Sequence, residues 1–514
     1  MLKYLACGIA CLSAAACAVP TVEGGNNGND RTNGGEQGEA LSTGAMVVSP
    51  DSRWAVMQRN QTSVLLDIEN MTAREMPAQV ARFAFSADSV HGFALLADGK
   101  LVNYDLRALT ARFETSLELR SGPAPSFLRL SDDDAFVLIG DGAELVIMSG
   151  TNGEFLKRVA LRSAAAELSF VPGKAHVLVV GTTRWEAHRP ATEVAEIDLE
   201  SFRVETIDVP NCTAPIEVLP DASRALLSPT FCEESVASTS QQTWTNPDPV
   251  SVIDLGERGP EFVRNLPGFG PVALEPSGQR AIAYLDVQRV DASLFDDPAQ
   301  VPSASGPRYH VMSIDPKTLA FELFPVGEVL PRFALGRDGK TLLVDATVQQ
   351  VRGKATVKAT LDSSGHLSAS FSVFGKVDSL FGALDLGTGV YAPFSGGAAA
   401  LDRFVQMGDE KRVFTLKLRA DGTGGDLYRI DLDTGTTTSL NRSLRDIGLL
   451  NDGATLLLRE RLPAVQVTVG TSASWYRRER YCLSLDGVTC SASVDFQDST
   501  PFQTGATCTD YHDC

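Results

Sequence analysis

One short pattern recurs along most of this chain, and it limits the fold more than any other feature of the sequence. Each copy begins with an apolar segment, continues through a turn rich in Ser, Pro, Asp or Gly, and resumes as a second apolar segment. We count nine copies of the turn-bearing part, at residues 47–51, 83–88, 128–132, 168–173, 217–221, 273–278, 334–339, 404–409 and 448–453. Self-similarity on this scale is typical of repeat architectures, in which each copy is one supersecondary unit.

The second half of each copy is an apolar segment that ends in Asp and is followed by a polar turn. It occurs at residues 66–67, 104–105, 197–198, 253–254, 314–315, 384–385 and 430–431, and two copies, at 148–149 and 483–484, carry Ser in place of Asp. Asp at the end of a strand commonly bonds the backbone of the turn that follows it. We therefore interpret the recurrent Asp residues as turn formers and not as catalytic groups.

Each unit supplies four short strands, named A to D in chain order, because the apolar residues alternate with a period of two between turn signals. No segment has a convincing helical period, so we expect few helices. One such sheet cannot bury both of its faces, whereas sheets standing side by side around an axis can. The sequence therefore predicts an all-β fold, a single β-propeller over residues 45–495. We expect eight blades, because known propellers usually have four to eight; seven and nine remain open.

Two segments carry a resemblance to a known family. Residues 49–54 read SPDSRW, and residues 250–255 read VSVIDL. Together they resemble the bacterial YVTN-type repeat, a relative of the WD40-like propellers. The resemblance implies the propeller architecture and implies no reaction.

The N-terminus predicts export. Lys3 precedes a short apolar stretch at residues 4–16, which is shorter than the roughly 20 apolar residues of a membrane span. The stretch ends in SAAAC, which resembles the bacterial lipobox with Cys17 as the lipid-modified residue. Cys11 is a weaker alternative, and an ordinary secretory signal cut after an Ala-x-Ala site is another. We predict a signal peptide at 1–17, with the mature chain held in the lipid bilayer by acylated Cys17.

A flexible Gly- and Asn-rich tether is expected at 18–44, because this stretch has almost no apolar residues to bury. Ala18 stands where some lipoproteins carry an Asp that retains them at the inner membrane. The resemblance therefore implies an outer-membrane anchor, with the protein facing the periplasm or the cell surface. The net charge of −19 makes nucleic acid an unlikely partner, since phosphate backbones require Lys and Arg.

Six cysteines lie outside the signal segment, and an even number in an exported chain predicts disulfides. Cys212 in a D–A connection and Cys232 in a B–C connection belong to the same face of the ring, so we expect them to pair. Cys482 and Cys490 flank a hairpin-turn dipeptide and are expected to pair across it. The third expected pair, Cys508 and Cys514, lies in a C-terminal tail at 496–514.

Unit length varies mostly between strands B and C, at residues 182–193, 229–248, 286–307, after 344 and at 460–480. Insertions gathered on one face of a repeat protein usually mark the binding face. These segments carry aromatic and Arg residues of the kind that anchor interfaces. The candidate binding residues are Arg184, Trp185, His188, Arg189, Trp244, Trp475, Tyr476, Arg477 and Arg478. The alternative is that the tryptophans pack these loops onto the top of the ring.

No G-x-S-x-G or H-E-x-x-H motif occurs, and the histidines are scattered. We therefore predict no catalytic residue, cofactor or metal, and favour a non-enzymatic scaffold that binds a protein or a glycan through the B–C loop face. Two alternatives stay open. One is a hydrolase of the lactonase type with its site at the channel mouth, and the other is a purely structural component of an envelope complex.

Overall fold

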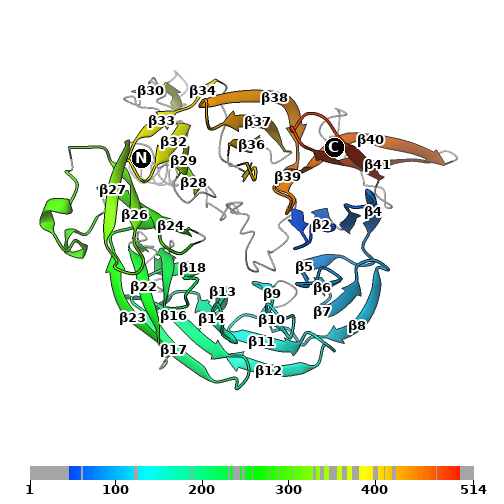
Figure 1. Cartoon of the computed structure of the whole chain (residues 1–514), viewed down its shortest axis with the longest axis horizontal. Coiled ribbons are helices and arrows are strands. Elements are labelled where there is room, and N and C mark those ends of the chain that lie inside the picture. The colour runs from blue at the N-terminus through cyan, green and yellow to red at the C-terminus, as the bar shows by residue number, and fades with distance from the viewer. Residues whose placement is uncertain are drawn as a thin grey trace.

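The chain forms nine four-stranded antiparallel sheets that stand side by side in a ring (Figure 1). This computed structural model describes residues 46–59, 62–120, 125–186, 189–229, 232–234, 243–245, 249–256, 259–275, 277–288, 290–303, 305–327, 332–335, 341–345, 356–361, 367–372, 381–396, 403–409, 411–419, 424–469 and 472–497. The all-β, single-propeller prediction is confirmed.

The first five blades follow the chain in order. Blade 1 is β1 (Met46–Val48), β2 (Trp54–Arg59), β3 (Thr62–Asp67) and β4 (Thr72–Glu75). Blade 2 is β5 (Val80–Phe85), β6 (His91–Leu96), β7 (Lys100–Asp105) and β8 (Thr110–Ser116). Blade 3 is β9 (Leu128–Leu130), β10 (Phe136–Gly140), β11 (Glu144–Ser149) and β12 (Phe155–Ala160). Blade 4 is β13 (Ala165–Phe170), β14 (His176–Gly181), β16 (Arg189–Asp198) and β17 (Val204–Val209). Blade 5 is β18 (Thr213–Val218), β19 (Arg224–Pro229), β22 (Val250–Gly256) and β23 (Gly259–Leu266).

The remaining four blades complete the ring. Blade 6 is β24 (Phe269–Leu274), β25 (Ala281–Asp286), β26 (Tyr309–Ile314) and β27 (Phe321–Gly327). Blade 7 is β28 (Arg332–Leu335), β29 (Thr341–Asp345), β32 (Phe381–Asp385) and β33 (Tyr391–Pro393). Blade 8 is β35 (Arg403–Gln406), β36 (Arg412–Leu418), β37 (Gly425–Asp431) and β38 (Thr436–Leu444), and the short β34 (Ser395–Gly396) pairs in parallel with β38. Blade 9 is β39 (Asp446–Leu449), β40 (Leu456–Val469), β41 (Ser472–Ser484) and β42 (Ala492–Gln497).

The expectation of eight blades is wrong, because all nine sequence units build a complete blade. The first and last blades close the ring by packing against each other without sharing a strand. One apolar cluster joins Met57 and Leu66 of blade 1 to Leu457 and Tyr481 of blade 9, and all four side chains are fully buried. Burial of this apolar surface drives closure, so no unit has to be divided between the chain ends.

The A–B turns hold neighbouring blades together through a repeated hydrogen bond. The backbone N–H of Asp51 donates to Ser89 Oγ of the next blade at 3.1 Å, and the backbone N–H of Ala87 donates to Asp134 of the blade after that at 2.8 Å. The same bond crosses the closure, where Asn451 N–H donates to Ser52 Oγ at 2.7 Å. The three accepting residues have φ of 57–59°, and this left-handed backbone is part of the same turn geometry.

Asp134 makes stability depend on pH. Burial raises the pKa of its carboxyl to about 6, with smaller contributions from Asp88, Asp133 and Asp132, while the Ala87 N–H opposes the shift. The folded state therefore binds more protons than the unfolded state between about pH 4 and 6, so stability falls as pH rises through this window. Asp134→Asn removes that loss and keeps an oxygen acceptor. We expect it to raise the free energy of unfolding at pH 7 by about 1–2 kcal/mol, less than the full shift because the group is partly exposed.

Denaturant unfolding at pH 4, 5 and 7 checks this expectation, with the gain shrinking toward pH 4. Asp133→Asn is the matched control, because a hydrogen bond from Ser131 lowers the pKa of Asp133. The ionised Asp133 therefore stabilises the fold, and its removal should lower the free energy of unfolding at pH 7. A loss of stability at pH 7 in Asp134→Asn would contradict this account of the turn.

The interpretation of the recurrent Asp residues as turn formers is confirmed. Asp198, Asp315 and Asp385 each accept hydrogen bonds from the backbone N–H groups two and three residues ahead. These bonds help to lower the pKa of all three carboxyls. Where Ser replaces Asp, its hydroxyl serves instead: Ser149 Oγ accepts from Thr151 N–H, and Ser484 Oγ from Gly487 N–H.

Helices are few in the described part of the chain, as the sequence predicts. Two short 3₁₀ turns occur there, η1 (Ala292–Leu294) and η2 (Pro298–Gln300), and both lie in the connection between strands B and C of blade 6. None of the helices in the described ranges has the length and apolar character required to cross a membrane.

Candidate functional site

The long B–C connections all emerge on one face of the ring, which we call the B–C face. Strands alternate in direction within each blade, so the A–B and C–D turns lie at one end and the B–C and D–A connections at the other. Several insertions form extra strands: β15 (Arg184–Glu186), the β20 (Cys232–Glu234) and β21 (Thr243–Thr245) hairpin, and the β30 (Thr356–Leu361) and β31 (Leu367–Ser372) hairpin. The predicted one-sided growth of the units is therefore present.

The fifth insertion differs from the loop expected at 460–480. Strands β40 and β41 simply continue, pairing from Leu456↔Ser484 outward to Val469↔Ser472 with one irregularity near Leu462. The resulting ribbon projects beyond the ring (Figure 1). Apolar and aromatic residues that alternate with polar ones are compatible with a long two-stranded ribbon, so this sequence forms strands where a loop was expected.

The candidate residues on blade 4 are partly neutralised. Arg184 forms ion pairs with Glu186 at 2.6 Å and with Asp208 at 2.8 Å, and Arg162 also reaches Asp208 at 2.8 Å. Trp185 is partly exposed and lies opposite Pro190 in the β15–β16 pair. Exposed Arg189 completes this group, and His188 lies outside the described residues.

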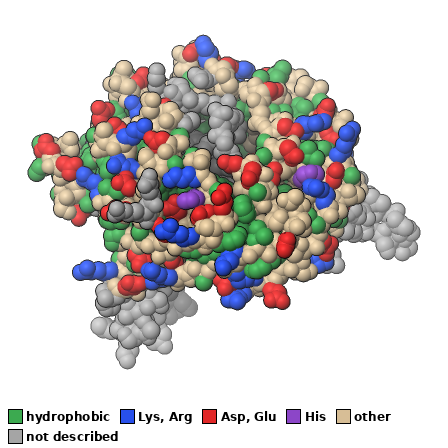
Figure 2. Space-filling model, turned by 60° about the horizontal axis from the view of Figure 1, so that its bottom comes forward, with side chains coloured by type: hydrophobic (Ala, Val, Ile, Leu, Met, Phe, Trp, Pro, Cys, Tyr) green, Lys and Arg blue, Asp and Glu red, His purple; other side chains and the backbone are tan. Residues whose placement is uncertain are grey.

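The candidate residues on blade 9 follow the same trend. Arg478 and Arg480 share one carboxylate, Asp495, at 3.4 and 2.7 Å. The rim there is consequently less basic than the sequence alone indicates, and Figure 2 shows Lys and Arg interspersed with Asp and Glu over the surface in view. Trp475, Tyr476 and Arg477 are placed in β41, and Trp244 in β21, but their side chains are outside the described set.

The candidates share a face but do not converge on one site. Blades 4 and 5 carry the first groups and blade 9 carries the last, with blades 1–3 between them on one side and blades 6–8 on the other. Figure 1 places β16 and β41 on opposite sides of the ring. A partner that touches all of them would have to span the ring opening.

Two buried carboxylates on the B–C face hold the D–A connections, and the sequence analysis missed both. Asp141 accepts from the backbone N–H of Arg120 at 2.8 Å and pairs with Arg158 at 3.0 Å. Glu193 accepts from the backbone N–H of Arg162 at 2.7 Å. Asp141 stands between two glycines and reads as an ordinary turn residue, so the sequence holds no signal that it is buried.

A small pocket lies between the B–C ends of blades 5 and 6. It is lined by Pro249, Pro267, Leu285 and Asp286, among others. Buried Asp286 accepts two hydrogen bonds from Arg308, at 3.0 and 2.8 Å, and this ion pair fixes the position of its carboxylate. Nearby in sequence, burial lowers the pKa of His310 and so favours the neutral imidazole.

Blade 9 contains a buried ionic cluster at the base of the ribbon. Arg459 is 1% exposed and donates through Nε and Nη2 to both carboxylate oxygens of Glu479, at 3.1 and 3.0 Å. Tyr481 O–H donates to the same carboxylate at 2.9 Å. The carboxylate raises the pKa of Arg459 despite its burial. The cluster orders the point at which β40 and β41 leave the ring.

Metal-binding groups and disulfides are two kinds of site that Cys or His side chains can form in the described ranges. Within them, no group of three or more His, Cys, Asp or Glu side chains is placed to hold a metal ion. The predicted Cys482–Cys490 disulfide is present, with the two Cα atoms 5.5 Å apart. Cys212 is also disulfide-bonded, whereas the side chain of its predicted partner Cys232, and the predicted Cys508–Cys514 pair, lie outside the described residues.

The nine four-stranded sheets arranged in a ring define a β-propeller. No family model matches the sequence, and neither does any curated protein. Among solved structures, a eukaryotic initiation factor has a TM-score of 0.48 and 10% identity over 78% of this chain and 88% of its own. Hydrazine synthase of Kuenenia stuttgartiensis has a TM-score of 0.36 and 13% identity over 66% of this chain and 97% of its own. The C-terminal WD40 domain of Sif2 has a TM-score of 0.35 and 11% identity over 46% of this chain and 65% of its own. Similarity at this level concerns the fold alone.

Proposed function

We propose that this protein is a non-enzymatic scaffold, anchored to the outer membrane through acylated Cys17, that holds a protein or glycan partner on its B–C face. The observation that supports it is the asymmetry of the ring. Five B–C connections are expanded into hairpins, 3₁₀ turns or a ribbon, whereas the A–B turns that the structure describes keep one repeated short geometry. Growth confined to one face of a repeat scaffold is typical of a binding surface.

The same proposal includes an export signal, lipid modification of Cys17 and membership of the YVTN-type family. It also includes a location in the periplasm or at the cell surface. A D strand ends, and an A strand begins, at the B–C end of each blade. The first described strand, β1, therefore starts on the B–C face, and a tether at 18–44 would join the ring there. The partner and the anchor then share one side of the molecule.

Substitutions on the two faces test the proposal. Trp185→Ala with Arg189→Ala on blade 4, and Trp475→Ala with Arg477→Ala on blade 9, should each reduce recovery of the specific partner at least fivefold after cross-linked affinity capture from intact envelopes. That loss corresponds to about 1 kcal/mol, which is the effect of truncating one interface anchor. Quantitative mass spectrometry of the captured material gives the measurement.

The matched control is Phe155→Ala with Val488→Ala, because these side chains are 51% and 54% exposed and lie at the opposite face. Phe155 begins β12 next to the C–D turn of blade 3, and Val488 lies in the C–D turn of blade 9. The control should capture the partner as the wild type does. If the control loses the partner and the B–C variants keep it, the binding face is wrongly assigned. If no variant changes the captured set, the scaffold role fails and the purely structural role is favoured.

A further inference from the structure

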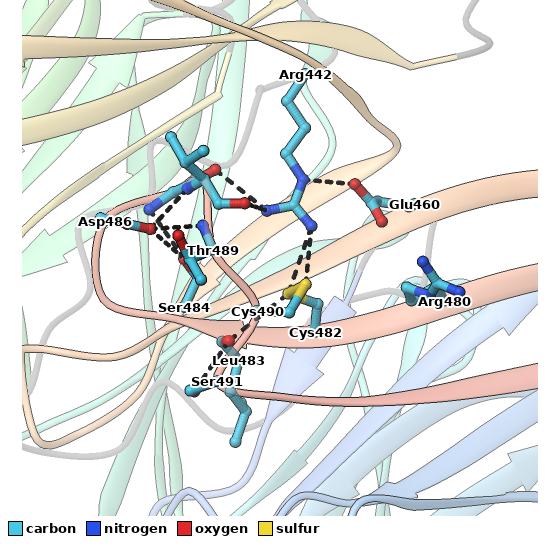
Figure 3. Close-up of a disulfide and its surroundings, with 12 residues drawn as sticks. Arg442, Glu460, Arg480, Cys482, Leu483, Ser484, Asp486, Thr489, Cys490 and Ser491 are labelled. Atoms are coloured by element: carbon cyan, nitrogen blue, oxygen red, sulfur yellow. Dashed lines mark hydrogen bonds and ion pairs between the residues drawn. A yellow bond between two sulfur atoms is a disulfide. The ribbon is translucent and has the colours of Figure 1, made fainter.

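The disulfide of blade 9 lies directly under an arginine of blade 8. Arg442, in β38, donates through Nη2 to Cys490 Sγ at 3.1 Å and to Cys482 Sγ at 3.4 Å (Figure 3). Its Nη1 donates to the carbonyl oxygens of Gly487 and Val488 in the same C–D hairpin, and its Nε bonds Glu460. The guanidinium is thus fixed from several sides with one edge toward the two sulfur atoms.

A cation in this position favours the reduced form of the pair. A thiolate carries the charge that Arg stabilises, whereas a disulfide is neutral, so a neighbouring guanidinium lowers the pKa of the thiols and raises the reduction potential. Glu460 offsets part of this charge, and the nearby Arg480 is bonded to Asp495. Arg442 Nη2 nevertheless remains the charged group in direct contact with both sulfur atoms.

The hairpin does not depend on the disulfide for its shape. Asp486 accepts from the backbone N–H groups of Val488 and Thr489, each at 2.8 Å, and from Ser484 Oγ. Ser491 donates to the carbonyl of Leu483 from both its N–H and its hydroxyl, at 2.8 and 3.1 Å. Beyond the turn, β41 and β42 are paired from Leu483↔Ala492 to Arg478↔Gln497. Opening the S–S bond therefore leaves a turn that is already closed by hydrogen bonds.

We propose that Cys482–Cys490 is a reversible thiol–disulfide exchange site whose substrate is a dithiol reductant, small or protein-borne. Cys490 is partly exposed, whereas Cys482 is fully buried, so attack occurs at Cys490. The reductant thiolate forms a bond to Cys490 Sγ, the Cys482–Cys490 bond breaks, and Cys482 leaves with the electron pair as a thiolate beside Arg442.

The second thiolate of the reductant then attacks the reductant sulfur that is bonded to Cys490. An S–S bond forms within the reductant, the bond to Cys490 breaks, and Cys490 leaves as a thiolate. The reductant becomes a cyclic disulfide, two electrons have passed to the protein, and the two protons of the dithiol go to solvent or to the new thiolates. The proposal concerns the A–B and C–D face and does not require the binding role of the B–C face.

Equilibration of the full-length protein in dithiothreitol buffers of graded redox poise tests the proposal. Differential alkylation and mass spectrometry of the peptides that carry Cys482 and Cys490 report the reduced fraction. Arg442→Met keeps the aliphatic stem and removes the charge, and we expect its equilibrium constant for reduction to fall about tenfold, equivalent to about 30 mV. Arg442→Lys should stay within about threefold of the wild type, because a cation beside the thiols is retained.

The matched control is Arg412→Met, since Arg412 bonds the carbonyl of Leu485 in the same hairpin and no contact with either sulfur is described for it. It should leave the constant unchanged. Equal constants for the wild type and Arg442→Met would overturn the proposal, and so would a Cys482–Cys490 bond that opens only when the whole protein unfolds, as followed by circular dichroism in the same samples.

Discussion

Replacing Arg459 with Met is expected to lower the free energy of unfolding by about 3–5 kcal/mol, the usual cost of breaking a buried ion pair from one side. The substitution leaves the Glu479 carboxylate, which is 4% exposed, without its two-pronged partner. The Tyr481 hydroxyl and Arg445, whose Nε lies 3.8 Å from Glu479 Oε1, stay near the carboxylate, but they do not replace the two hydrogen bonds that Arg459 donates to it. Denaturant unfolding at pH 7, followed by tryptophan fluorescence, gives the measurement.

Two further variants separate the ionic explanation from simple packing. Arg459→Met combined with Glu479→Leu removes both charges, and we expect it to recover most of the lost stability. Arg480→Met, in the same strand as Glu479, breaks the exposed pair with Asp495 of β42 and should cost less than about 1 kcal/mol. A loss below 1 kcal/mol for Arg459→Met alone would show that Glu479 is solvated or protonated, and would contradict the account of the cluster.

The second large effect is expected at the closure of the ring. Leu457→Ala should cost about 2–5 kcal/mol, because the side chain is fully buried in the cluster that joins blade 9 to blade 1. Leu485→Ala, in the same blade, is the control: its side chain is 57% exposed, so the change should be within about 0.5 kcal/mol. Similar values for the two variants would contradict the burial that closes the ring.

The architecture was predictable because it depends on local signals. Turn residues such as Asp198 and Ser149 bond their own backbone, so their role is readable within a few residues of sequence. The location of the B–C insertions was equally readable as variation in unit length. The blade number was not, although nine units were counted, because closure is a long-range event between residues such as Leu66 and Leu457 that no local pattern reports.

The candidate site was predicted only in part, for the same reason. Residue type identified Arg184 and Arg478 as exposed cations, but their partners Asp208 and Asp495 lie on other strands of the same sheets. Which residues face each other across those strands cannot be read from the sequence. Arg459 and Glu479 were missed because they fall at the ends of an expected loop. Only the continued pairing of β40 with β41 shows that both are buried in a sheet.

The closed ring requires blade 1 to pack against blade 9, and a double-mutant cycle between Leu66 and Leu457 measures that packing most directly. The two residues are far apart in sequence and share one buried cluster. Leu66→Ala and Leu457→Ala should be coupled, so that the double variant departs from the sum of the singles by about 0.5–3 kcal/mol. Additive losses would mean that the two blades do not touch, and the nine-bladed closed ring would be contradicted.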